Sequence, residues 1–344
     1  MINKKVMKGK AGKSGAYIVH AEQTILKALG SNPTDFALSL RYSFQDDSNY
    51  YLMFQFCSGG DLDFHLNHNP DKRNVWTKAR IVFYSAEVIS ALVHMHKLNI
   101  LHRDIKPLNI LLDTEGHCIL SDFGLAAKAT KNGKPRKNEY VGTPGYIAPE
   151  IIERKEHGPP CDFWSMGCMI YEFYNKRGPF HPEITGSTDV QTSVLNAEPK
   201  FPTSDFKIEK AQNITPDGQD LIEKMLVKDP EKRLHKLEDI KKHDFFSEID
   251  WEKMEKKKME VPWKPDITVN AKGVMEIEEC NDDDVYRNIT VAAEDVIADF
   301  DFVGGKYHRQ DLRKVLEKKY KGALDDLPDP AEAPPPAGGC CIIA

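Results

Sequence analysis

The sequence predicts an α+β protein with one helix-rich main domain, an extended tail and a distinct C-terminal segment. Two β signals support this: a short aromatic-rich run that ends at Ser58-Gly59-Gly60, and a hairpin pattern at residues 111–120. Several stretches carry apolar residues at helical spacing. The chain has 344 residues, of which 40% are hydrophobic, which suffices for a core and suggests about two folding units.

The main domain, from about residue 42 to 246, divides into strands and helices. Residues 50–57 predict a buried strand, because they are apolar, aromatic-rich and bounded by a glycine turn. Residues 79–98 predict a helix, with further helices over 162–174 and 216–227. Residues 111–113 and 117–120 flank a polar Thr-Glu-Gly turn and predict a β-hairpin.

The composition changes after residue 246. Residues 276–301 contain ten acids and one base, and residues 306–321 contain seven bases and two acids. Residues 328–339 are rich in Pro, Ala and Gly, which predicts a flexible linker. The chain then ends in the sequence C-C-I-I-A.

Charge and cysteine content exclude several classes of protein. The net charge of −6 argues against a nucleic-acid-binding protein, so no nucleic-acid partner is expected. No run of 18 apolar residues could span a membrane, and residues 1–13 carry five lysines without the apolar core of a secretory signal. Seven scattered cysteines do not form a disulfide framework, so a reducing, intracellular setting is expected.

Three motifs in fixed order carry the chemistry. The octet H-R-D-I-K-P-L-N occupies residues 102–109, D-F-G follows at 122–124, and G-T-P-G-Y-I-A-P-E follows at 142–150. The octet matches the protein-kinase catalytic loop, and the spacing of the other two is kinase-like. From residue 1 to about 302, the chain therefore resembles a eukaryotic protein kinase of the AGC group.

This resemblance implies a two-lobed protein-kinase fold with an incomplete small lobe, a mostly helical large lobe and an AGC-type tail. The expected boundaries are a partial small lobe over 1–56, a large lobe over 57–246 and a tail over 247–305. A basic segment, a linker and the C-terminal cysteine motif fill residues 306–344.

The resemblance also implies roles in transfer of the γ-phosphoryl group of ATP to protein serine or threonine. Phosphoryl transfer depends on positioning and on neutralising charge. Asp122 and Asn109 are expected to bind Mg²⁺ through oxygen atoms. Asp104 is expected to orient the substrate hydroxyl, and Lys106 to neutralise charge on the phosphoryl group. Lys106 together with Thr143 is the pattern of serine/threonine kinases.

The expected ATP pocket follows from the same resemblance. Residues 51–57 resemble the kinase hinge, with Phe54 at the gatekeeper position and the backbones of Gln55 and Cys57 binding adenine. By itself this segment predicts a core strand and a turn. The three motifs further along the chain favour its interpretation as the kinase hinge. The remaining expected pocket residues are Asp61, which would reach the ribose, Leu111, and Glu22, which resembles the helix αC glutamate.

Two family motifs do not occur before the hinge. The sequence contains neither G-x-G-x-x-G nor V-A-I-K there, and the residues at the start of the chain resemble those that follow the family lysine. One hypothesis is that the chain is an N-terminally truncated piece of a longer active kinase. The other is that it is a kinase-derived scaffold, or pseudokinase.

Several regulatory features are expected in and around the activation segment, residues 137–146, and in the tail. Glu150 is expected to form a buried ion pair with Arg233. Glu139 occupies the place of a phosphorylated Ser/Thr before Thr143. In the tail, the hydrophobic motif is expected at Phe300, Asp301 and Phe302, with Asp301 at its phosphosite. Because both sites carry a permanent negative charge, the kinase is expected to need phosphorylation at neither, although each acid also fits a plain surface residue.

Within the AGC group, the activation segment most resembles that of G-protein-coupled-receptor kinases. Leu108 replaces the glutamate that many basophilic AGC kinases carry there. Asp61 and Glu172 are the remaining acidic residues that could bind a substrate arginine. A weakened preference for arginine near the target residue is therefore expected.

The C-terminal residues 341–344 fit a C-a-a-X prenylation box at Cys341, and the final alanine favours farnesyl. One lipid chain anchors a protein only marginally, so a second signal is expected. That signal could be palmitoylation of Cys340, or contact of residues 306–321 with anionic lipid. The expected partners are protein substrates and a membrane surface, and the expected location is cytoplasmic and peripheral to the membrane.

Overall fold

The structure is a computed structural model, and it forms two compact units. The smaller unit comprises Met1–Pro33, Leu38–Gln55 and Ile277–Ala344, and the larger unit comprises Thr34–Ala37 and Phe56–Glu276. The described residues are 2–3, 15–45, 49–71, 74–131, 133–202, 214–266, 300 and 302–303.

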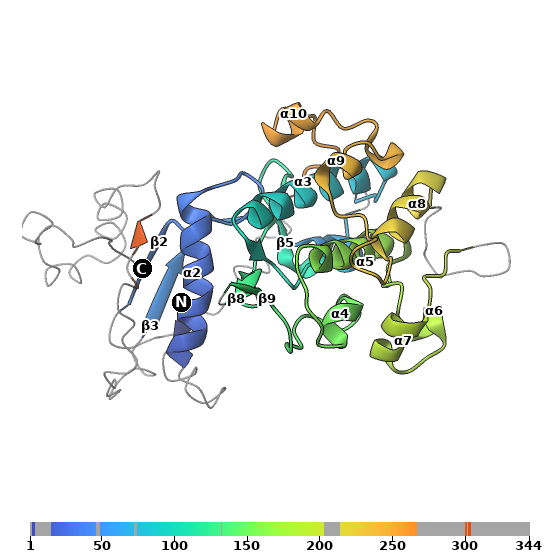
Figure 1. Cartoon of the computed structure of the whole chain (residues 1–344). Helices are drawn as coiled ribbons and strands as arrows, with labels where there is room; N and C mark the ends of the chain where they lie inside the picture. Colours follow the sequence, from blue (N-terminus) through green and yellow to red (C-terminus); the bar gives the residue numbers. More distant parts are fainter. Residues whose placement is uncertain are drawn as a thin grey trace, which may run out of the picture. The chain divides into compact units, whose positions relative to one another are not determined.

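The smaller unit contains one antiparallel sheet and one long helix. The strands are β1 (Ile2–Asn3), β2 (Tyr42–Gln45), β3 (Asn49–Met53) and β10 (Phe302–Val303), in the order β1-β3-β2-β10. Figure 1 shows α2 (Gly15–Ser31) lying alongside β2 and β3. Strand β10 comes from the far end of the chain, where Phe302 pairs with Ser43 of β2.

The core of the smaller unit joins α2 to the C-terminal segment. Phe300 is buried against Val19 of α2 and Tyr50 of β3, with the Tyr50 and Phe300 ring centroids 5.3 Å apart. The carbonyl oxygen of Phe300 accepts a hydrogen bond from Ser43 Oγ at 2.7 Å and another from the amide nitrogen of Gln23. The aromatic residues of the expected hydrophobic motif are thus part of this unit's core and sheet, while Asp301 lies outside the described residues.

The larger unit is mostly helical. Its long helices are α3 (Lys78–Lys97), α5 (Pro160–Asn175) and α8 (Pro216–Met225). Its shorter helices are η1 (Phe64–His68), η2 (Pro107–Asn109), α4 (Pro149–Ile152), α6 (Pro182–Thr185), α7 (Val190–Asn196), α9 (Leu237–Ile240), η3 (Asp244–Phe246) and α10 (Trp251–Glu255). Three short antiparallel strand pairs complete it: β4 (Ile100–Leu101) with β7 (Ala127–Lys128), β5 (Ile110–Leu112) with β6 (Cys118–Leu120), and β8 (Thr130–Lys131) with β9 (Lys134–Pro135).

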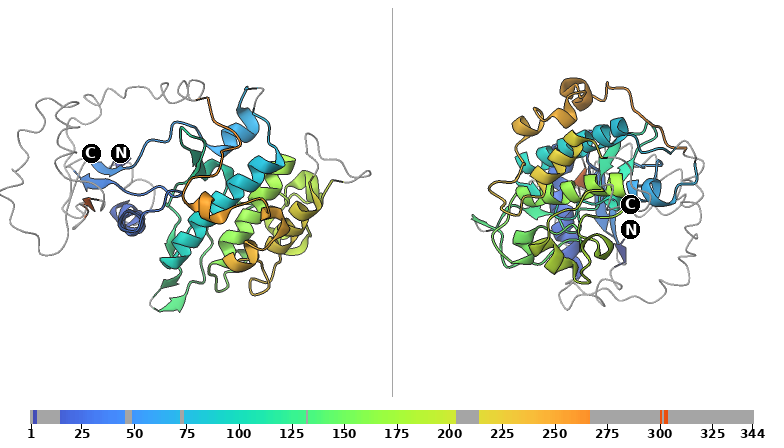
Figure 2. Two further views of the ribbon diagram at one scale, coloured as in Figure 1. Left: turned by 90° about the horizontal axis from the view of Figure 1, so that it is seen from above. Right: turned by 90° about the vertical axis from the view of Figure 1, so that its right-hand side faces the viewer.

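Helix α5 is the centre of the larger unit and is buried along nearly its whole length. Figure 2 shows it packed beside α3, and α8 packs on another side. Gly167 permits the contact with α8, because a Cβ atom there would lie 2.9 Å from the Met225 side chain and 3.0 Å from that of Leu226. Helix α5 therefore supplies a rigid base for the loops that begin or end on it.

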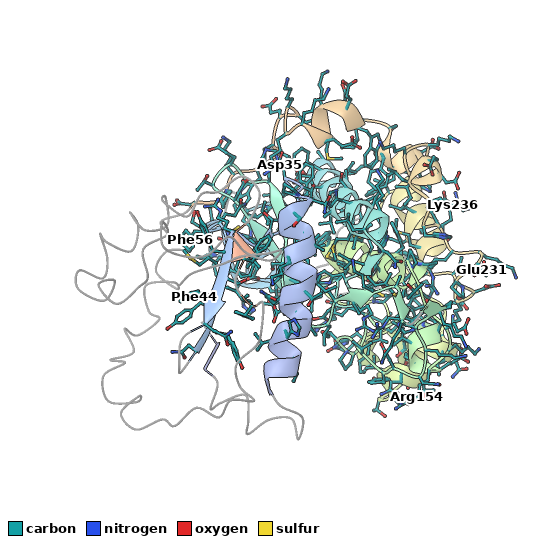
Figure 3. The ribbon with its side chains drawn as sticks, turned by 60° about the vertical axis from the view of Figure 1, so that its left-hand side comes forward. Asp35, Phe44, Phe56, Arg154, Glu231 and Lys236 are labelled. Carbon is teal, nitrogen blue, oxygen red and sulfur yellow. The ribbon has the colours of Figure 1, made fainter. Side chains whose placement is uncertain are left out.

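The predicted helices and hairpin are confirmed, with shifts of one or two residues at most of their ends. The predicted strand over 50–57 is wrong at its end, because β3 stops at Met53. Residues 54–57 have no regular structure, and Phe56, labelled in Figure 3, is 74% exposed. Its hydrophobicity predicted burial, but the strand ends before it and a turn follows at residues 58–59.

Within the residues that the structure describes, no helix combines the length and apolar character needed to cross a bilayer.

A buried ion pair ties the end of the third motif to the C-terminal half of the larger unit. Arg233 donates two parallel hydrogen bonds to Glu150, of 2.7 and 2.9 Å, and both side chains are buried. Arg233 also donates to the carbonyl oxygens of Pro160, Val227 and Lys228. The pair expected from the sequence is present, and all polar atoms of the guanidinium are used.

Replacing Arg233 by methionine should destabilise the protein strongly, because the Glu150 carboxylate would stay buried without its partner. The expected loss in free energy of unfolding is about 3–5 kcal/mol, measured by urea denaturation. Lys232→Met is the matched control, since Lys232 has a 77% exposed side chain that pairs with Asp229, and it should shift stability by less than about 1 kcal/mol. A loss below about 1 kcal/mol for Arg233→Met would contradict the role assigned to the pair.

Candidate active site

The loop at residues 102–109 is held in place by one buried carboxylate. Asp162, in the first turn of α5, accepts hydrogen bonds from the backbone amides of His102 at 3.0 Å and Arg103 at 2.7 Å. The His96 ring of α3 donates to the same carboxylate at 2.8 Å. Burial opposes ionisation of Asp162, but hydrogen bonds from His96 and the Arg103 amide outweigh it and hold its pKa below the usual value.

This brace holds a strained backbone. Arg103 has φ of +67°, in the left-handed region that residues other than glycine rarely occupy. Such conformations persist when surrounding contacts fix them, as the Asp162 hydrogen bond to the Arg103 amide does here. With the backbone held in this way, the Arg103 side chain contacts Glu139, whereas the Asp104 side chain contacts Lys106 and Thr143.

Asp104, Lys106 and Thr143 form a closed triangle. Lys106 Nζ donates to Asp104 Oδ2 at 2.7 Å and to Thr143 Oγ1 at 2.8 Å, and the Thr143 hydroxyl donates to Asp104 Oδ1 at 2.5 Å. Burial favours the neutral form of Asp104, but the hydrogen bonds from Lys106 and Thr143 outweigh it and lower its pKa. The triangle thus keeps a carboxylate ionised beside an ammonium and a hydroxyl.

Asn109 and Asp122 stand at the two open ends of the β5–β6 hairpin. The amide nitrogen of Asn109 donates to the Asp104 carbonyl at 2.8 Å and to Asp104 Oδ2 at 3.0 Å, which leaves the amide oxygen as the ligating atom. The Asn109 carbonyl accepts from the Ser121 amide at 2.9 Å, so Asp122 follows directly. Asp122 is exposed, has φ of +58°, and accepts only a 3.2 Å bond from the Gly124 amide among its described contacts.

These two side chains fit a hard divalent cation. One carboxylate and one amide oxygen are the ligand types that magnesium prefers, with further ligands drawn from phosphate and water. Across the described part of the chain, no group of three or more His, Cys, Asp or Glu side chains could hold a metal ion. The donor set therefore suits a cation bound together with a nucleotide and offers no closed zinc-type cage.

Glu139 connects the activation segment to the catalytic loop. Arg136 donates two hydrogen bonds to its carboxylate, at 2.9 and 2.7 Å, and Arg103 donates a third at 2.5 Å. Burial alone would raise the pKa of Glu139, but these arginine hydrogen bonds lower it. Arg103 also donates to the Leu125 carbonyl at 2.9 Å, so one guanidinium joins the segments on both sides.

The expected ATP-pocket residues divide between the two units. In the larger unit, Asp61 and Leu111 form an isolated antiparallel bridge, and Cys57 is half-buried. Burial raises the pKa of Asp61, and its carboxylate accepts the Phe64 amide at 2.8 Å. Three further residues lie in the smaller unit: Glu22 within α2, and Phe54 and Gln55 after β3.

Glu172, which the sequence offered as a binding residue for a substrate arginine, already has a hydrogen-bond partner within the protein. It lies on the buried length of α5, and the Tyr146 hydroxyl donates a short hydrogen bond to it. Burial raises the pKa of Glu172 from 4.5 to about 7, against the opposing effect of the Tyr146 hydrogen bond. By contrast, Leu108 is 54% exposed and offers an apolar surface on the loop.

Some site residues were not predicted from sequence. His96 precedes the loop by six positions, and nothing in its neighbourhood distinguishes it from a surface histidine. Arg136 lies in a run of lysines, and this local sequence predicts an exposed charged side chain there. Its spacing of three residues before Glu139 is the only available signal, and that signal is weak without the fold.

The family model described as "Protein kinase domain" matches residues 1–246. The chain belongs to this family, which confirms the predicted α+β kinase fold. Membership implies ATP and, in general, a divalent metal as cofactors, in agreement with the ligand types found at Asn109 and Asp122.

The curated relatives are serine/threonine kinases, and the predicted resemblance to AGC kinases and to G-protein-coupled-receptor kinases is confirmed. The chain is 37% identical to protein kinase 2 of Dictyostelium discoideum over 72% of its length and 48% of the relative. It is 36% identical to mouse ribosomal protein S6 kinase alpha-4 over 72% of its length and 31% of that protein. It is 37% identical to human rhodopsin kinase GRK7 over 81% of its length and 48% of that protein. It thus spans about a third to a half of these relatives.

The raised pKa of Glu172 predicts a pH-dependent stability. Between pH 4.5 and about 7 the folded protein binds a proton that the unfolded chain has lost, so stability falls as pH rises. Above pH 7 the ionised, buried carboxylate should lower the free energy of unfolding of the wild type by up to about 3 kcal/mol, and Glu172→Gln should remove this loss. Urea denaturation of both proteins at pH 5 and pH 8 measures it.

The control is Glu248→Gln, which changes an exposed glutamate. Its stability difference from wild type should be equal at the two pH values. A Glu172→Gln difference that is also constant would show that Glu172 titrates normally.

Proposed function

We propose that the chain is the catalytic part of a serine/threonine protein kinase that transfers the γ-phosphoryl group of ATP to protein hydroxyls. The observation that carries this proposal is the Asp104–Lys106–Thr143 triangle, with Asn109 bonded to the same aspartate. It brings an ionised carboxylate, an ammonium and a metal-ligating amide together on one loop. Phosphoryl transfer needs these groups in fixed positions and little else from the protein.

Each group has one task in the proposed reaction. Asp104 accepts the proton of the substrate hydroxyl while that oxygen bonds to the γ-phosphorus and the bond to the ADP oxygen breaks. Lys106 offsets the negative charge on the phosphoryl oxygens. Asn109 and Asp122 would hold Mg²⁺, which when bound neutralises phosphate charge. In this structure the Thr143 hydroxyl bonds to Asp104, showing that an alcohol fits against this carboxylate.

The activation segment supports a kinase that is active without phosphorylation at residue 139. The Glu139 carboxylate already engages Arg103 and Arg136, as a phosphate in that place would. Arg103 directly precedes Asp104, so this contact bears on the loop that carries the chemistry. For Asp301 the same proposal rests on the sequence alone.

The substrate is proposed to be a protein serine or threonine with little requirement for nearby arginine. Leu108 presents an exposed apolar side chain in place of a carboxylate. Glu172 is bonded to Tyr146 and has a raised pKa, so its negative charge is weakened at neutral pH. Among Leu108, Glu172 and Asp61, only Asp61 is an acid that is partly accessible and not bonded to Tyr146.

We also propose that the protein is anchored to the cytoplasmic face of a membrane. The support is the sequence of the last residues, with Cys341 in a C-a-a-X box, Cys340 beside it and a basic stretch over 306–321. All of these residues lie outside the described part of the chain. A prenyl group and a second signal together would restrict the kinase to substrates at the membrane surface.

Substitution of the two aspartates tests the catalytic proposal. Asp104→Asn and Asp122→Asn should each lower kcat by about 10²–10⁴-fold, because each removes a charge that the transition state requires. Phosphate transfer from ATP to a mixed Ser/Thr peptide library, with Mg²⁺ present, measures this. The exposed Asp244→Asn is the control and should keep full activity.

The same assay decides between the catalytic proposal and a kinase-derived scaffold. A wild-type chain that transfers no phosphate, and whose thermal stability is unaffected by ATP with Mg²⁺, would be a scaffold. Transfer that persists in Asp104→Asn would come from a contaminating enzyme or from another mechanism.

Glu139→Ala should lower kcat by about tenfold, a change of ~1.4 kcal/mol in the activation barrier, because Arg103 loses its acidic partner. Glu156→Ala is the matched control, since Glu156 pairs with Lys137 of the same segment but has a 56% exposed side chain. Steady-state kinetics on both variants measure the effect. Unchanged kcat in Glu139→Ala would show that this contact does not support activity.

A further inference from the structure

The segment 257–264, which follows α10, lies across the turn of the β5–β6 hairpin. We refer to residues 257–264 as the clamp segment. In Figure 2 the orange chain after α10 runs along the larger unit toward η1. The hairpin is the element whose open ends carry Asn109 and Asp122, so contacts at its turn bear on the candidate metal site.

The first contact is an ion pair at the start of the turn. Lys257 Nζ bonds to Asp113 Oδ2 at 2.9 Å, and each side chain is about one-fifth exposed, at 22% and 21%. The other oxygen of Asp113 accepts the amides of Glu115 at 3.0 Å and His117 at 2.9 Å. One carboxylate therefore closes the turn and binds the clamp segment at the same time.

The second contact is made by backbone. Gly116 has φ of +94°, and a Cβ atom there would lie 2.5 Å from the carbonyl oxygen of Trp263 and 2.9 Å from a Val261 methyl group. The clamp segment thus rests directly on the tip of the hairpin. Only glycine suits both this backbone angle and this approach.

The third contact fixes the far end of the clamp segment. The Arg80 guanidinium lies 4.0 Å from the centre of the Trp263 ring and 4.5 Å from that of Trp76. Arg80 is 1% exposed, and its Nε and Nη2 atoms have no hydrogen-bond partner among the described residues. Contact with two indole rings compensates a buried cation that has no acidic partner among the described residues, so Trp263 is held strongly.

The same tryptophan reaches the hairpin by a second route. The ring centroids of Trp263 and His65 are 4.9 Å apart, in an edge-on arrangement. His65 donates to the Gly59 carbonyl at 2.5 Å, and the Gly59 amide donates to Leu112 of β5 at 3.0 Å. The clamp segment thus touches the turn directly and reaches β5 through His65.

Helix α3 makes a further contact with the hairpin. Glu87, fully buried in α3, accepts the His117 ring at 2.6 Å and the Cys118 amide at 2.7 Å. The hairpin is therefore held by both α3 and the clamp segment. Each strand has only three residues, about 10 Å, so displacement of the turn reaches the open ends.

We propose that the clamp segment positions the β5–β6 hairpin, and with it Asn109 and Asp122, for binding of a divalent cation together with a nucleotide. Lys257 and Trp263 are positioning residues in this scheme and contact neither cation nor nucleotide. The functional consequence rests on the proposed kinase activity, whereas the effect on the hairpin does not.

Hydrogen–deuterium exchange of the full chain tests the structural half. Lys257→Met and Asp113→Asn should each speed amide exchange about fivefold in the peptide covering residues 109–122. Asn at 113 can still accept the two turn amides, so only the contact with Lys257 is lost. The double variant should exchange no faster than either single variant, because both remove one interaction.

Three further variants make this test specific. Lys258→Met alters the neighbouring exposed lysine and should leave exchange unchanged. Trp263→Ala should speed exchange in the same peptide, and Trp263→Phe, which keeps a ring over Arg80, should restore most of the protection. Exchange that stays unchanged in both Lys257→Met and Trp263→Ala, or that rises equally in the peptide covering α8, would overturn the proposal.

Nucleotide binding tests the functional half. With a fluorescent ATP analogue, Lys257→Met should raise the Mg²⁺ concentration needed for half-saturation about threefold or more and leave metal-free binding unchanged. An equal loss with and without Mg²⁺ would contradict a role at the cation. If wild type binds no nucleotide, the proposed kinase function fails, while the exchange result still decides whether residues 257–264 hold the hairpin.

Discussion

The buried carboxylate of Asp162 is the contact on which the rest of the larger unit's site depends. It is anchored in α5, the helix that the core of the unit surrounds, and it accepts two consecutive backbone amides of the catalytic loop. Those bonds hold Arg103 at positive φ, which sends its side chain to Glu139 and leaves Asp104 to face Lys106 and Thr143. One side chain therefore links the hydrophobic core to both the catalytic loop and the activation segment.

A second constraint acts on the hairpin that carries the candidate metal ligands. Hairpins with three-residue strands are marginal by themselves, so their position depends on what surrounds them. Glu87 binds one side of this hairpin from α3, and the clamp segment binds its turn through Lys257 and Gly116. The distant tail segment thus gives the hairpin a definite position that its local sequence could not secure.

The sequence predicted the catalytic motifs because short loops with fixed chemistry leave recognisable strings such as residues 102–109 and 122–124. It also predicted the long helices, whose apolar spacing reflects burial against a core. It failed at residues 54–57, where hydrophobicity predicted a buried strand and Phe56 lies exposed. It did not find the contacts of His96 or the stacking of Arg80 on Trp263, because both join residues far apart in the chain and neither has a local pattern.

The acidic residues of the larger unit divide by how fully their oxygens are used. Glu150, Asp162 and Glu87 are buried, and protein donors use both oxygens of each carboxylate. A carboxylate in that state would lose these bonds by binding a cation or a substrate, so its role is to hold segments together. Asp122 is exposed and makes one weak described contact with its own turn, so it can bind a ligand without disturbing the fold. Asp104 lies between these cases: Lys106 and Asn109 fix its orientation, while the Thr143 hydroxyl marks the place where another hydroxyl can be received.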